Sequence, residues 1–312
     1  MRVLITSPLR ADVFGRFLPA DLEVDLETLE ERTEDGLVAA APGCEVLVAD
    51  WLFQVPVSAR VVERLDACRL IQQPSAGFQL IDLGAAAARG IPVANAPGNS
   101  VAVAEWTVMA IISLLRRAAE ADRRMREGEW PTGELSRELT ELAGKTVGIV
   151  GFGRIGREVA KRLAGFDCEV IAYDLVHEVI TIDSMPYVEL AELLARSDAV
   201  TIHVPLTPET RHLVDPLAIK KGAVLVNAAR GGVVDEGAVI AALDQGHLRG
   251  VALDVFDEEP LAADAAIRRH PLVLLSPHLA GVTRESGRRL IEMTAANVTR
   301  ALRGEPLEWL VQ

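Results

Sequence analysis

The sequence predicts an α/β protein built on doubly wound parallel sheets, and three observations support this. Short apolar segments alternate with helix-like segments along most of the chain. Aromatic residues make up only 4% of the chain, while Ala, Val and Leu are abundant, which suits strands packed under alanine-rich helices. A glycine-rich turn directly follows one of the apolar segments, as expected where a parallel strand leads into a helix.

Composition narrows the classes of function. The chain has 312 residues, enough for two domains, and its net charge of -13 disfavours nucleic acid and anionic lipid as partners. Cys44, Cys68 and Cys168 are too few and too widely spaced for a disulfide framework or a metal site. No apolar run is long enough to span a membrane, and the first residues lack the features of a signal peptide. We therefore expect a cytoplasmic protein.

The first hundred residues are predicted to form one parallel sheet with its helices. Gly43 and Gly90 lie where two of these helices should end. The predicted strands are residues 3–6, 45–49, 70–72 and 92–94, and the predicted helices are residues 34–41, 59–65 and 83–89.

A single long helix is predicted after the turn at residues 97–100, because residues 101–127 contain neither Pro nor Gly. Its first half, residues 101–115, is hydrophobic and should be buried, with a second subunit as one candidate for the covering surface. Its second half is charged and should be solvated. Trp130, just beyond it, is either a packed surface side chain or one that reaches a partner's site.

A second alternating series then begins. Its six predicted strands match the strand number of a doubly wound domain, and the final helix, residues 284–303, is a candidate to return to the first domain. The strands are predicted at residues 145–150, 169–173, 199–203, 223–227, 250–253 and 273–275.

The glycine loop is the motif with the strongest structural context. The apolar strand at residues 145–150 runs directly into GFGRIG at residues 151–156, and an amphipathic helix follows. In such a loop Gly151 allows the tight turn, Gly153 lets the backbone approach a pyrophosphate, and Gly156 lets the helix lie close to the strand. The free N–H groups at the start of the helix would bind phosphate. The alternative is a glycine turn in an unrelated α/β protein.

Asp174 indicates which dinucleotide is bound. It ends the next strand, 18 residues after Gly156, where a carboxylate can accept hydrogen bonds from both ribose hydroxyls of the adenosine. It would also repel a 2′-phosphate, and the following Leu175 and Val176 carry no cation. The sequence therefore favours NAD over NADP.

Three further strand ends carry polar residues that fit one reaction. Reduction of a 2-oxo acid needs a cation for the carboxylate, a proton for the carbonyl oxygen and a hydride. Arg230 can bind the carboxylate and carbonyl oxygens through its planar fork. His278 can give or take the proton, and Glu259 can hold the other ring nitrogen of His278 and stabilise the imidazolium. The hydride belongs to the cofactor.

Each of these residues also has a plainer interpretation. Arg230 could be a phosphate contact or a salt bridge, Glu259 part of a solvated acidic loop, and His278 a satisfied helix-start residue. Their occurrence together downstream of the glycine loop favours the functional interpretation. His203, at another strand end, is a rival base, although its segment is more simply a loop beside the cofactor.

Several further motifs occur in register with these: GIPVANAP at residues 90–97, VAE at 103–105 and HVPLTPET at 203–210. With the glycine loop, Asp174 and the Arg, Glu and His segments, they make the chain resemble the D-isomer-specific 2-hydroxyacid dehydrogenase family over nearly its whole length. The resemblance implies that Arg230, Glu259 and His278 form the catalytic set, and that Asp254 binds the nicotinamide carboxamide.

The resemblance also implies an organisation in domains. A flavodoxin-like substrate domain would comprise residues 1–98 and 283–312. A Rossmann domain of residues 99–282 would bind NAD and be inserted between hinges near residues 97–100 and 281–284. The helix after Ser100 would help to form a homodimer. The cofactor-contacting residues would be Gly151, Gly153, Arg154, Ile155, Gly156, Asp174, Val204, Pro205, Ala228, Asp254 and Gly281.

The substrate loop departs from the family pattern of Gly-x-Gly followed by Asp, because residues 74–79 are PSAGFQ. Backbone N–H groups of Ser75, Ala76 and Gly77 could still hold a carboxylate, and Arg230 is a further substrate-binding candidate. Phosphite dehydrogenases have Lys in place of Ala76, and formate dehydrogenases have Gln in place of Glu259. The stretch after Asp174 is shorter than is usual in the family, so the adenosine pocket can differ.

The segment after the third strand indicates the substrate side chain. Phosphoglycerate dehydrogenases tend to carry basic residues here, whereas this chain has DWLF at residues 50–53. Trp51 and Leu52 thus favour a small or apolar side chain, as in glyoxylate- or hydroxypyruvate-like 2-oxo acids. Two alternatives stay open: an NAD(H)-sensing binding protein of the corepressor type, and a dehydrogenase for another anion such as phosphite.

Overall fold

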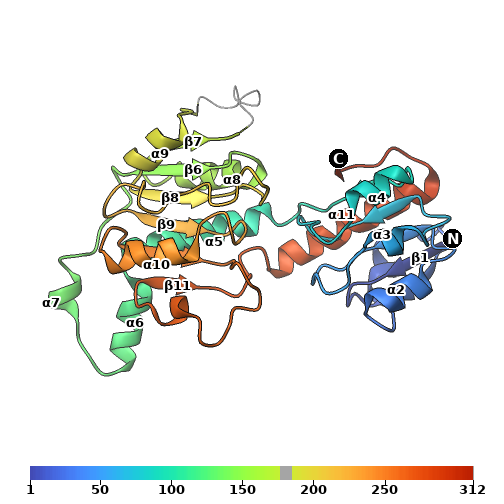
Figure 1. Cartoon of the computed structure of the whole chain (residues 1–312), viewed down its shortest axis with the longest axis horizontal. Helices are drawn as coiled ribbons and strands as arrows, with labels where there is room; N and C mark the ends of the chain where they lie inside the picture. Colours follow the sequence, from blue (N-terminus) through green and yellow to red (C-terminus); the bar gives the residue numbers. More distant parts are fainter. Residues whose placement is uncertain (176–184, 312) are drawn as a thin grey trace. The chain divides into compact units, whose positions relative to one another are not determined.

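The computed structural model describes residues 1–175 and 185–311, and the chain divides into two compact units (Figure 1). The first unit comprises Met1–Asn99 and Thr283–Gln312, and the second comprises Ser100–Val282. The chain passes between them at residues 99–100 and 282–283. No helix in the described part of the chain is long and apolar enough to cross a membrane.

The first unit contains a sheet in the order β12-β5-β4-β3-β1-β2. Its five parallel strands give the flavodoxin-like order 2-1-3-4-5, and β12 pairs antiparallel with β5. The strands are β1 (Arg2–Ile5), β2 (Asp25–Thr28), β3 (Val46–Val48), β4 (Leu70–Gln72), β5 (Val93–Ala94) and β12 (Leu310–Val311). The helices are α1 (Ala11–Phe14), η1 (Gly15–Phe17), α2 (Glu34–Ala40), α3 (Ala59–Val62), α4 (Leu83–Ala88) and α11 (Arg284–Arg303).

Alternate residues of these strands face opposite cores, as strand geometry requires. Leu4, Leu47 and Ile71 pack with the buried residues of α2, α3 and α4. Val3 and Val46, one position earlier, pack instead with Phe14 of α1 and with α11. The sheet is therefore covered on both faces, and α11 belongs to the first unit although it is the last helix of the chain.

The second unit contains a six-stranded parallel sheet in the order β11-β10-β9-β8-β6-β7. The strand order reverses between β6 and β8, which is where ligands bind in open α/β sheets. The strands are β6 (Thr146–Val150), β7 (Glu169–Tyr173), β8 (Ala199–Ile202), β9 (Val224–Asn227), β10 (Gly250–Leu253) and β11 (Val273–Leu275). The helices are α5 (Ser100–Leu115), α6 (Ala118–Arg126), α7 (Thr132–Leu135), α8 (Arg154–Leu163), α9 (Leu190–Arg196), α10 (Glu236–Asp244) and η3 (Ala266–Arg269).

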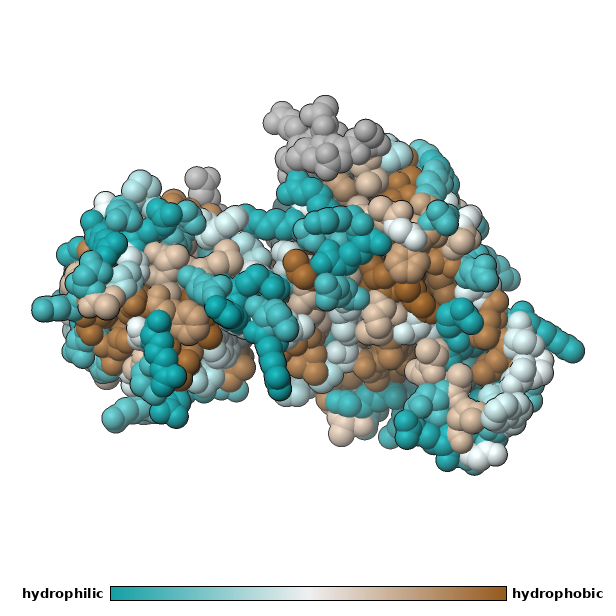
Figure 2. All heavy atoms as spheres, turned by 180° about the vertical axis from the view of Figure 1, so that it is seen from behind, coloured by the Kyte–Doolittle hydropathy of each residue, from teal (hydrophilic) through white to brown (hydrophobic). Residues whose placement is uncertain are grey.

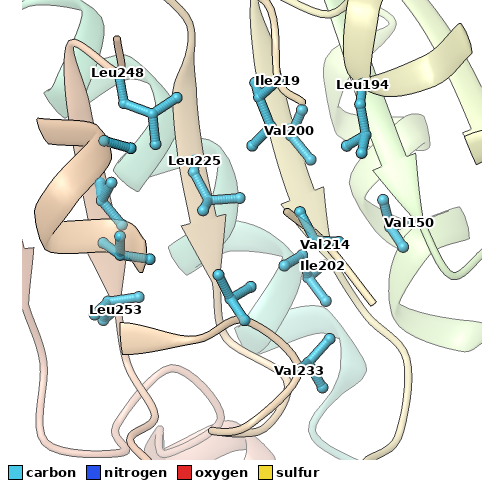
Figure 3. Packing of buried hydrophobic residues seen from close by; sticks show 14 of the residues in the cluster. Val150, Leu194, Val200, Ile202, Val214, Ile219, Leu225, Val233, Leu248 and Leu253 are labelled. Carbon is cyan, nitrogen blue, oxygen red and sulfur yellow. The ribbon is translucent and has the colours of Figure 1, made fainter. Parts of the chain in front are cut away.

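Two apolar cores cover this second sheet. Helices α5 and α8 pack on one face, and α9 and α10 on the other. Figure 3 shows the second of these cores, in which Val200, Ile202 and Leu225 of the strands meet Leu194 of α9. The prediction of an α/β protein with two mostly parallel sheets is thus confirmed. Packing of the strands in these cores holds the strand ends in position.

The prediction of one continuous helix over residues 101–127 is wrong, because the structure has two helices there. Its first half is the buried α5, as predicted, but the chain turns at Arg117, whose φ of 47° is left-handed, and α6 starts anew. Arg117 is held there by ion pairs to Glu120 and Glu138. No residue of α6 is buried, so the apolar pattern that keeps α5 on the sheet ends where the turn occurs.

Candidate active site

The glycine loop lies at the point where the strand order of the second sheet reverses. Gly151 has a φ of 96°, and a Cβ there would lie 2.7 Å from the carbonyl carbon of His203, which follows β8. A Cβ at Gly156 would overlap the carbonyl oxygen of Gly151. A Cβ at Gly153 would meet nothing within 4 Å. Packing within the chain therefore requires the first and last glycines, whereas Gly153 leaves open space above the start of α8.

The start of α8 and Asp174 complete a site suited to a dinucleotide. Gly153 is the N-cap of α8 and provides no side chain to cap the first N–H groups, which a pyrophosphate can therefore bind. Asp174 follows β7, and its Oδ2 accepts the backbone N–H of Phe152 at 2.7 Å. Burial, together with the charge of Asp174, raises the pKa of Tyr187. The carboxylate is thus fixed beside the glycine loop, and the residues present fit NAD. Val176 lies outside the described residues.

Glu259 and His278 form a direct pair. His278 Nδ1 lies 2.7 Å from Glu259 Oε2, and the other carboxylate oxygen of Glu259 accepts the backbone N–H of Phe256 at 3.0 Å. Both side chains are partly exposed, 42% for His278 and 36% for Glu259. An imidazole with Nδ1 held by a carboxylate keeps Nε2 as the nitrogen that exchanges a proton with a ligand.

Arg230 lies close enough to this pair for its charge to interact with Glu259. Burial lowers the pKa of Arg230, and the charge of Glu259 opposes that shift. The Arg230 loop is anchored by Asn227, whose Nδ2 donates to the Arg230 carbonyl at 2.9 Å and whose Oδ1 accepts the N–H of Ala229 at 3.0 Å. A Cβ at Gly231 would overlap the carbonyl group of Phe256, so the two loops pack tightly. The structure therefore brings together the three residues predicted as catalytic.

Asp254 holds the turn that carries His278. It is 1% exposed, and its two carboxylate oxygens accept the N–H groups of Leu279 at 2.7 Å and Ala280 at 2.9 Å. Its carbonyl accepts the N–H of His278, which has a left-handed φ of 56°. Burial raises the pKa of Asp254. This role was missed in the sequence because its partners lie about 25 residues away; its contact with the carboxamide stays a proposal.

His203 is not suited to act as the base. Its Nε2 lies 2.9 Å from Thr201 Oγ1, and its Nδ1 is buried with no hydrogen-bond partner among the described residues. Burial lowers the pKa of His203 to about 3, so the ring is neutral near pH 7. Its segment instead supports the glycine loop.

The other candidate cofactor residues lie around the same strand ends. Ala228 forms a small apolar cluster with Val103 and Ala280, against which Ile155 packs. Val204 is buried, and Pro205 is exposed with its carbonyl bonded by Thr210 Oγ1 at 2.6 Å. Gly281 follows the turn held by Asp254, and Arg154 is the first residue of α8.

The candidate substrate residues of the first unit lie in two segments, Ser75 to Gly77 in one and Trp51 with Leu52 in the other. Ser75 Oγ accepts the Gln73 amide at 2.7 Å and donates to the carbonyl of Gly77 at 3.1 Å. The carbonyl of Ala76 accepts the Asn95 amide at 2.8 Å. Trp51 is partly buried against the core that contains α11, whereas Leu52 is 49% exposed.

Comparison with known proteins decides the family. Residues 108–280 match the family model described as "D-isomer specific 2-hydroxyacid dehydrogenase, NAD binding domain". The chain belongs to this family. The chain is accordingly an NAD-dependent oxidoreductase acting on CH–OH groups, and the matched domain lies in the second unit.

Relatives of this 2-hydroxyacid dehydrogenase bear several names. A glyoxylate reductase of Thermofilum pendens is 43% identical over 258 residues, which cover 80% of this chain and 76% of that protein. A D-3-phosphoglycerate dehydrogenase of Archaeoglobus fulgidus is 34% identical over 98% of this chain, which spans only 58% of that protein's length.

Solved structures agree over the whole chain. A glyoxylate reductase from Paecilomyes thermophila superposes with a TM-score of 0.89 at 28% identity, covering 100% of this chain and 98% of that one. The apo form of a Rhodotorula graminis D-mandelate dehydrogenase has a TM-score of 0.88, also at 28% identity, with coverage of 100% and 97%. The fold is therefore shared by enzymes whose names indicate different substrates.

Proposed function

We propose that this protein transfers a hydride between NAD and C2 of a small 2-oxo or 2-hydroxy acid whose side chain is glyoxylate-like, hydroxypyruvate-like or apolar. The observation that carries the proposal is the 2.7 Å pair of His278 and Glu259 in a site that also contains Arg230. Relatives named glyoxylate reductase support the substrate class.

Bound NADH supplies the hydride, and the side chains of the protein hold the acid and its proton. Arg230 offers a planar cation to the carboxylate and the carbonyl oxygen. His278 donates the Nε2 proton to the carbonyl oxygen as C2 is reduced, and Glu259 stabilises the imidazolium beforehand. In the reverse direction His278 takes the hydroxyl proton.

The glycine loop, Asp174 and residues 75–77 each have a binding role in this proposal. The backbone of Gly151, Gly153 and Gly156 with the start of α8 would hold the pyrophosphate, and Asp174 would hold the adenosine ribose. The N–H groups of Ser75, Ala76 and Gly77 would bind the substrate carboxylate. The substrate domain would thus comprise residues 1–98 and 283–312, which lie in the first unit, and the cofactor domain residues 99–282.

The direct test is NADH oxidation against a panel of 2-oxo acids from glyoxylate and hydroxypyruvate to phenylpyruvate, with phosphite and NAD run in reverse. We expect turnover on small or apolar acids, and we expect His278→Ala to bind NADH normally while losing most turnover. Silence across the panel with tight NADH binding would contradict the proposal and indicate an NAD(H)-sensing protein. Turnover on phosphite alone would indicate a different anion.

A homodimer is part of the same proposal. Helix α6 has no buried residue, and Met109, Met125 and Trp130 are 44%, 47% and 79% exposed. Figure 2 shows hydrophobic side chains on the rear face of the second unit. A contiguous apolar patch is typical of contacts with another subunit, and we propose that this face makes them. Light scattering after size exclusion should give twice the 33.6 kDa chain mass; a monomer at micromolar concentration would contradict this.

Use of NADH and three free cysteines suit a cytoplasmic enzyme. The charge of -13 leaves no general attraction for nucleic acid. Fractionation of the source cells, followed by activity measurement in each fraction, tests the location.

A further inference from the structure

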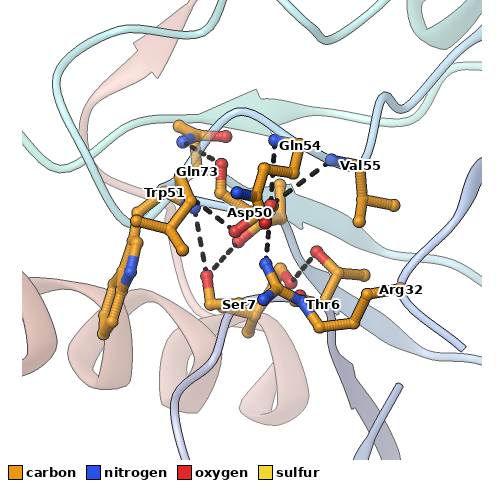
Figure 4. Close-up of polar contacts among 11 residues, drawn as sticks. Thr6, Ser7, Arg32, Asp50, Trp51, Gln54, Val55 and Gln73 are labelled. Carbon is orange, nitrogen blue, oxygen red and sulfur yellow. Dashed lines mark hydrogen bonds and ion pairs between the residues drawn. The ribbon is translucent and has the colours of Figure 1, made fainter. Parts of the chain in front are cut away.

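A buried ion pair lies under the loop that follows β3 in the first unit. Arg32 Nη2 is 2.9 Å from Asp50 Oδ2, and the Asp50 side chain is fully buried while that of Arg32 is 28% exposed (Figure 4). Arg32 Nε also donates to the carbonyl of Thr6 at 3.2 Å. Burial of a carboxylate is costly unless a cation and hydrogen bonds satisfy it, so Asp50 and Arg32 depend on each other.

The backbone of the loop is wrapped around Asp50. The Asp50 carboxylate accepts the N–H groups of Leu52 and Gln54 at 3.0 Å each and that of Val55 at 3.3 Å. Phe53, in the middle of the loop, has a left-handed φ of 54°. These bonds all end on one side chain, so its charge and position determine the shape of the loop.

The same ion pair determines the charge that the loop presents. The side chains of Trp51, Leu52 and Phe53 are apolar, and Asp50, which precedes them, neutralises its ion-pair partner Arg32. The loop therefore offers apolar side chains without a net positive charge at the carboxyl end of β3.

Gln73 connects this loop to the predicted carboxylate-binding loop. Its amide nitrogen donates to the carbonyl of Asp50 at 3.3 Å and to Ser75 Oγ at 2.7 Å. A change in the position of Asp50 would therefore affect both the loop at residues 51–55 and the loop at residues 75–77, where the proposed function places the substrate carboxylate.

We propose that Asp50 is a positioning residue that shapes residues 51–55 and masks the charge of Arg32. The enzyme thereby accepts 2-oxo acids with an uncharged side chain and discriminates against those with a second anion. This inference rests on the proposed function, which it extends to the selection of substrates. Asp50 and Arg32 act through the loop and not on the reacting atoms.

The test compares two acids of equal chain length, 2-oxobutanoate and oxaloacetate, which differ in a terminal methyl or carboxylate group. Asp50→Asn retains a side-chain acceptor but leaves the charge of Arg32 uncompensated. We expect kcat/KM for oxaloacetate relative to 2-oxobutanoate to rise about tenfold or more, mainly through the KM for oxaloacetate. The double variant D50N/R32Q removes both charges and should return the ratio to the wild-type value.

Asp35→Asn is the matched control, because Asp35 forms an exposed ion pair with Arg60 in the same unit, with side-chain exposures of 79% and 61%. It should leave the ratio unchanged. A folded Asp50→Asn variant with the wild-type ratio would overturn the proposal, and so would an equal change in Asp35→Asn.

Hydrogen exchange of the full chain tests the positioning without any turnover. Asp50→Ala should speed exchange in the peptide that contains residues 51–55, and Asp35→Ala should not. Unchanged exchange in the Asp50 variant would refute the positioning role. If the wild-type chain reduces no 2-oxo acid, the proposed function has failed, and the exchange rates still decide whether Asp50 holds the loop.

Discussion

Replacement of Glu259 by Gln removes the charge of the proposed catalytic pair while keeping the shape of the side chain. A glutamine has the same shape, and its amide oxygen can still accept the Phe256 N–H that anchors the loop, but its NH2 group then faces His278 Nδ1 and can only donate there. What is lost is the negative charge 2.7 Å from His278 Nδ1 and the acceptor for an Nδ1 proton, so the loss of the charge sets the smallest expected effect. Two charges about 4 Å apart interact by about 1 kcal/mol in water and about 4 kcal/mol near a protein surface.

Because the pair is partly exposed, its interaction energy should lie between these two values. Because both side chains are more than a third exposed, we take about 2 kcal/mol, which corresponds to about a 30-fold lower kcat. The stabilisation acts on the imidazolium and not on the cofactor, so the NADH dissociation constant should stay within about twofold, on the same reasoning.

Stopped-flow or steady-state NADH oxidation on the best panel acid gives kcat, and NADH fluorescence titration gives the dissociation constant. Glu258→Gln is the control, since Glu258 is an adjacent exposed carboxylate for which no contact with His278 is seen. If Glu259→Gln keeps kcat within about threefold of wild type, or if Glu258→Gln loses as much, the charge of Glu259 does not support His278.

Three further predictions concern the second unit. Asp174→Ala should reduce the preference for NADH over NADPH about tenfold or more, by kcat/KM ratios, because it removes the repulsion of a 2′-phosphate; an unchanged ratio would contradict the assignment. Gly156→Ala should lower the free energy of unfolding by about 2 kcal/mol or more, since its Cβ would overlap the Gly151 carbonyl. Gly153→Ala should instead have the melting temperature of wild type and bind NADH weakly. Similar melting temperatures for the two variants would refute this. The pKa of His203 is about 3 in the folded chain and about 6.5 when unfolded, so the unfolded state binds the proton first and the free energy of unfolding falls as the pH drops through that range. Between pH 7 and 5 this loss is about 2 kcal/mol. His203→Asn should remove the loss in urea titrations, and an equal pH dependence of the free energy of unfolding in wild type and variant would contradict this.

Secondary structure was predictable from the sequence wherever it depends on residues close by in the chain. All six strands of the second sheet lie where apolar runs are bounded by turn residues. Strand β2 was missed because Asp25–Thr28 is a polar segment at the sheet edge, with no fully buried residue. The turn at Arg117 was missed because its left-handed φ is stabilised by Glu138, 21 residues away, and not by a local Gly or Pro.

In the candidate site, too, some features were predictable from the sequence and others were not. The order of Arg230, Glu259 and His278 on successive strand ends was sufficient to predict that they meet, because the carboxyl ends of parallel strands share one edge. Motif spacing could not show which groups hold them. Asp254 accepts N–H groups 25 and 26 residues away, and Asp50 pairs with a cation 18 residues before it.

Both units use a buried carboxylate just after a parallel strand to shape a turn with an unusual backbone. In the first unit Asp50 follows β3 and holds the loop that contains Phe53 at φ 54°. In the second, Asp254 follows β10 and holds the turn that contains His278 at φ 56°. A left-handed residue other than glycine is costly, and several N–H bonds to one rigidly placed carboxylate offset that cost. The strand fixes the carboxylate, and the carboxylate fixes the turn. The two turns differ in their partners, because Asp50 pairs with Arg32, whereas Asp254 holds the turn that carries His278. The turn paired with Arg32 is the one proposed to select an uncharged side chain, and the other turn places the imidazole proposed to exchange the proton.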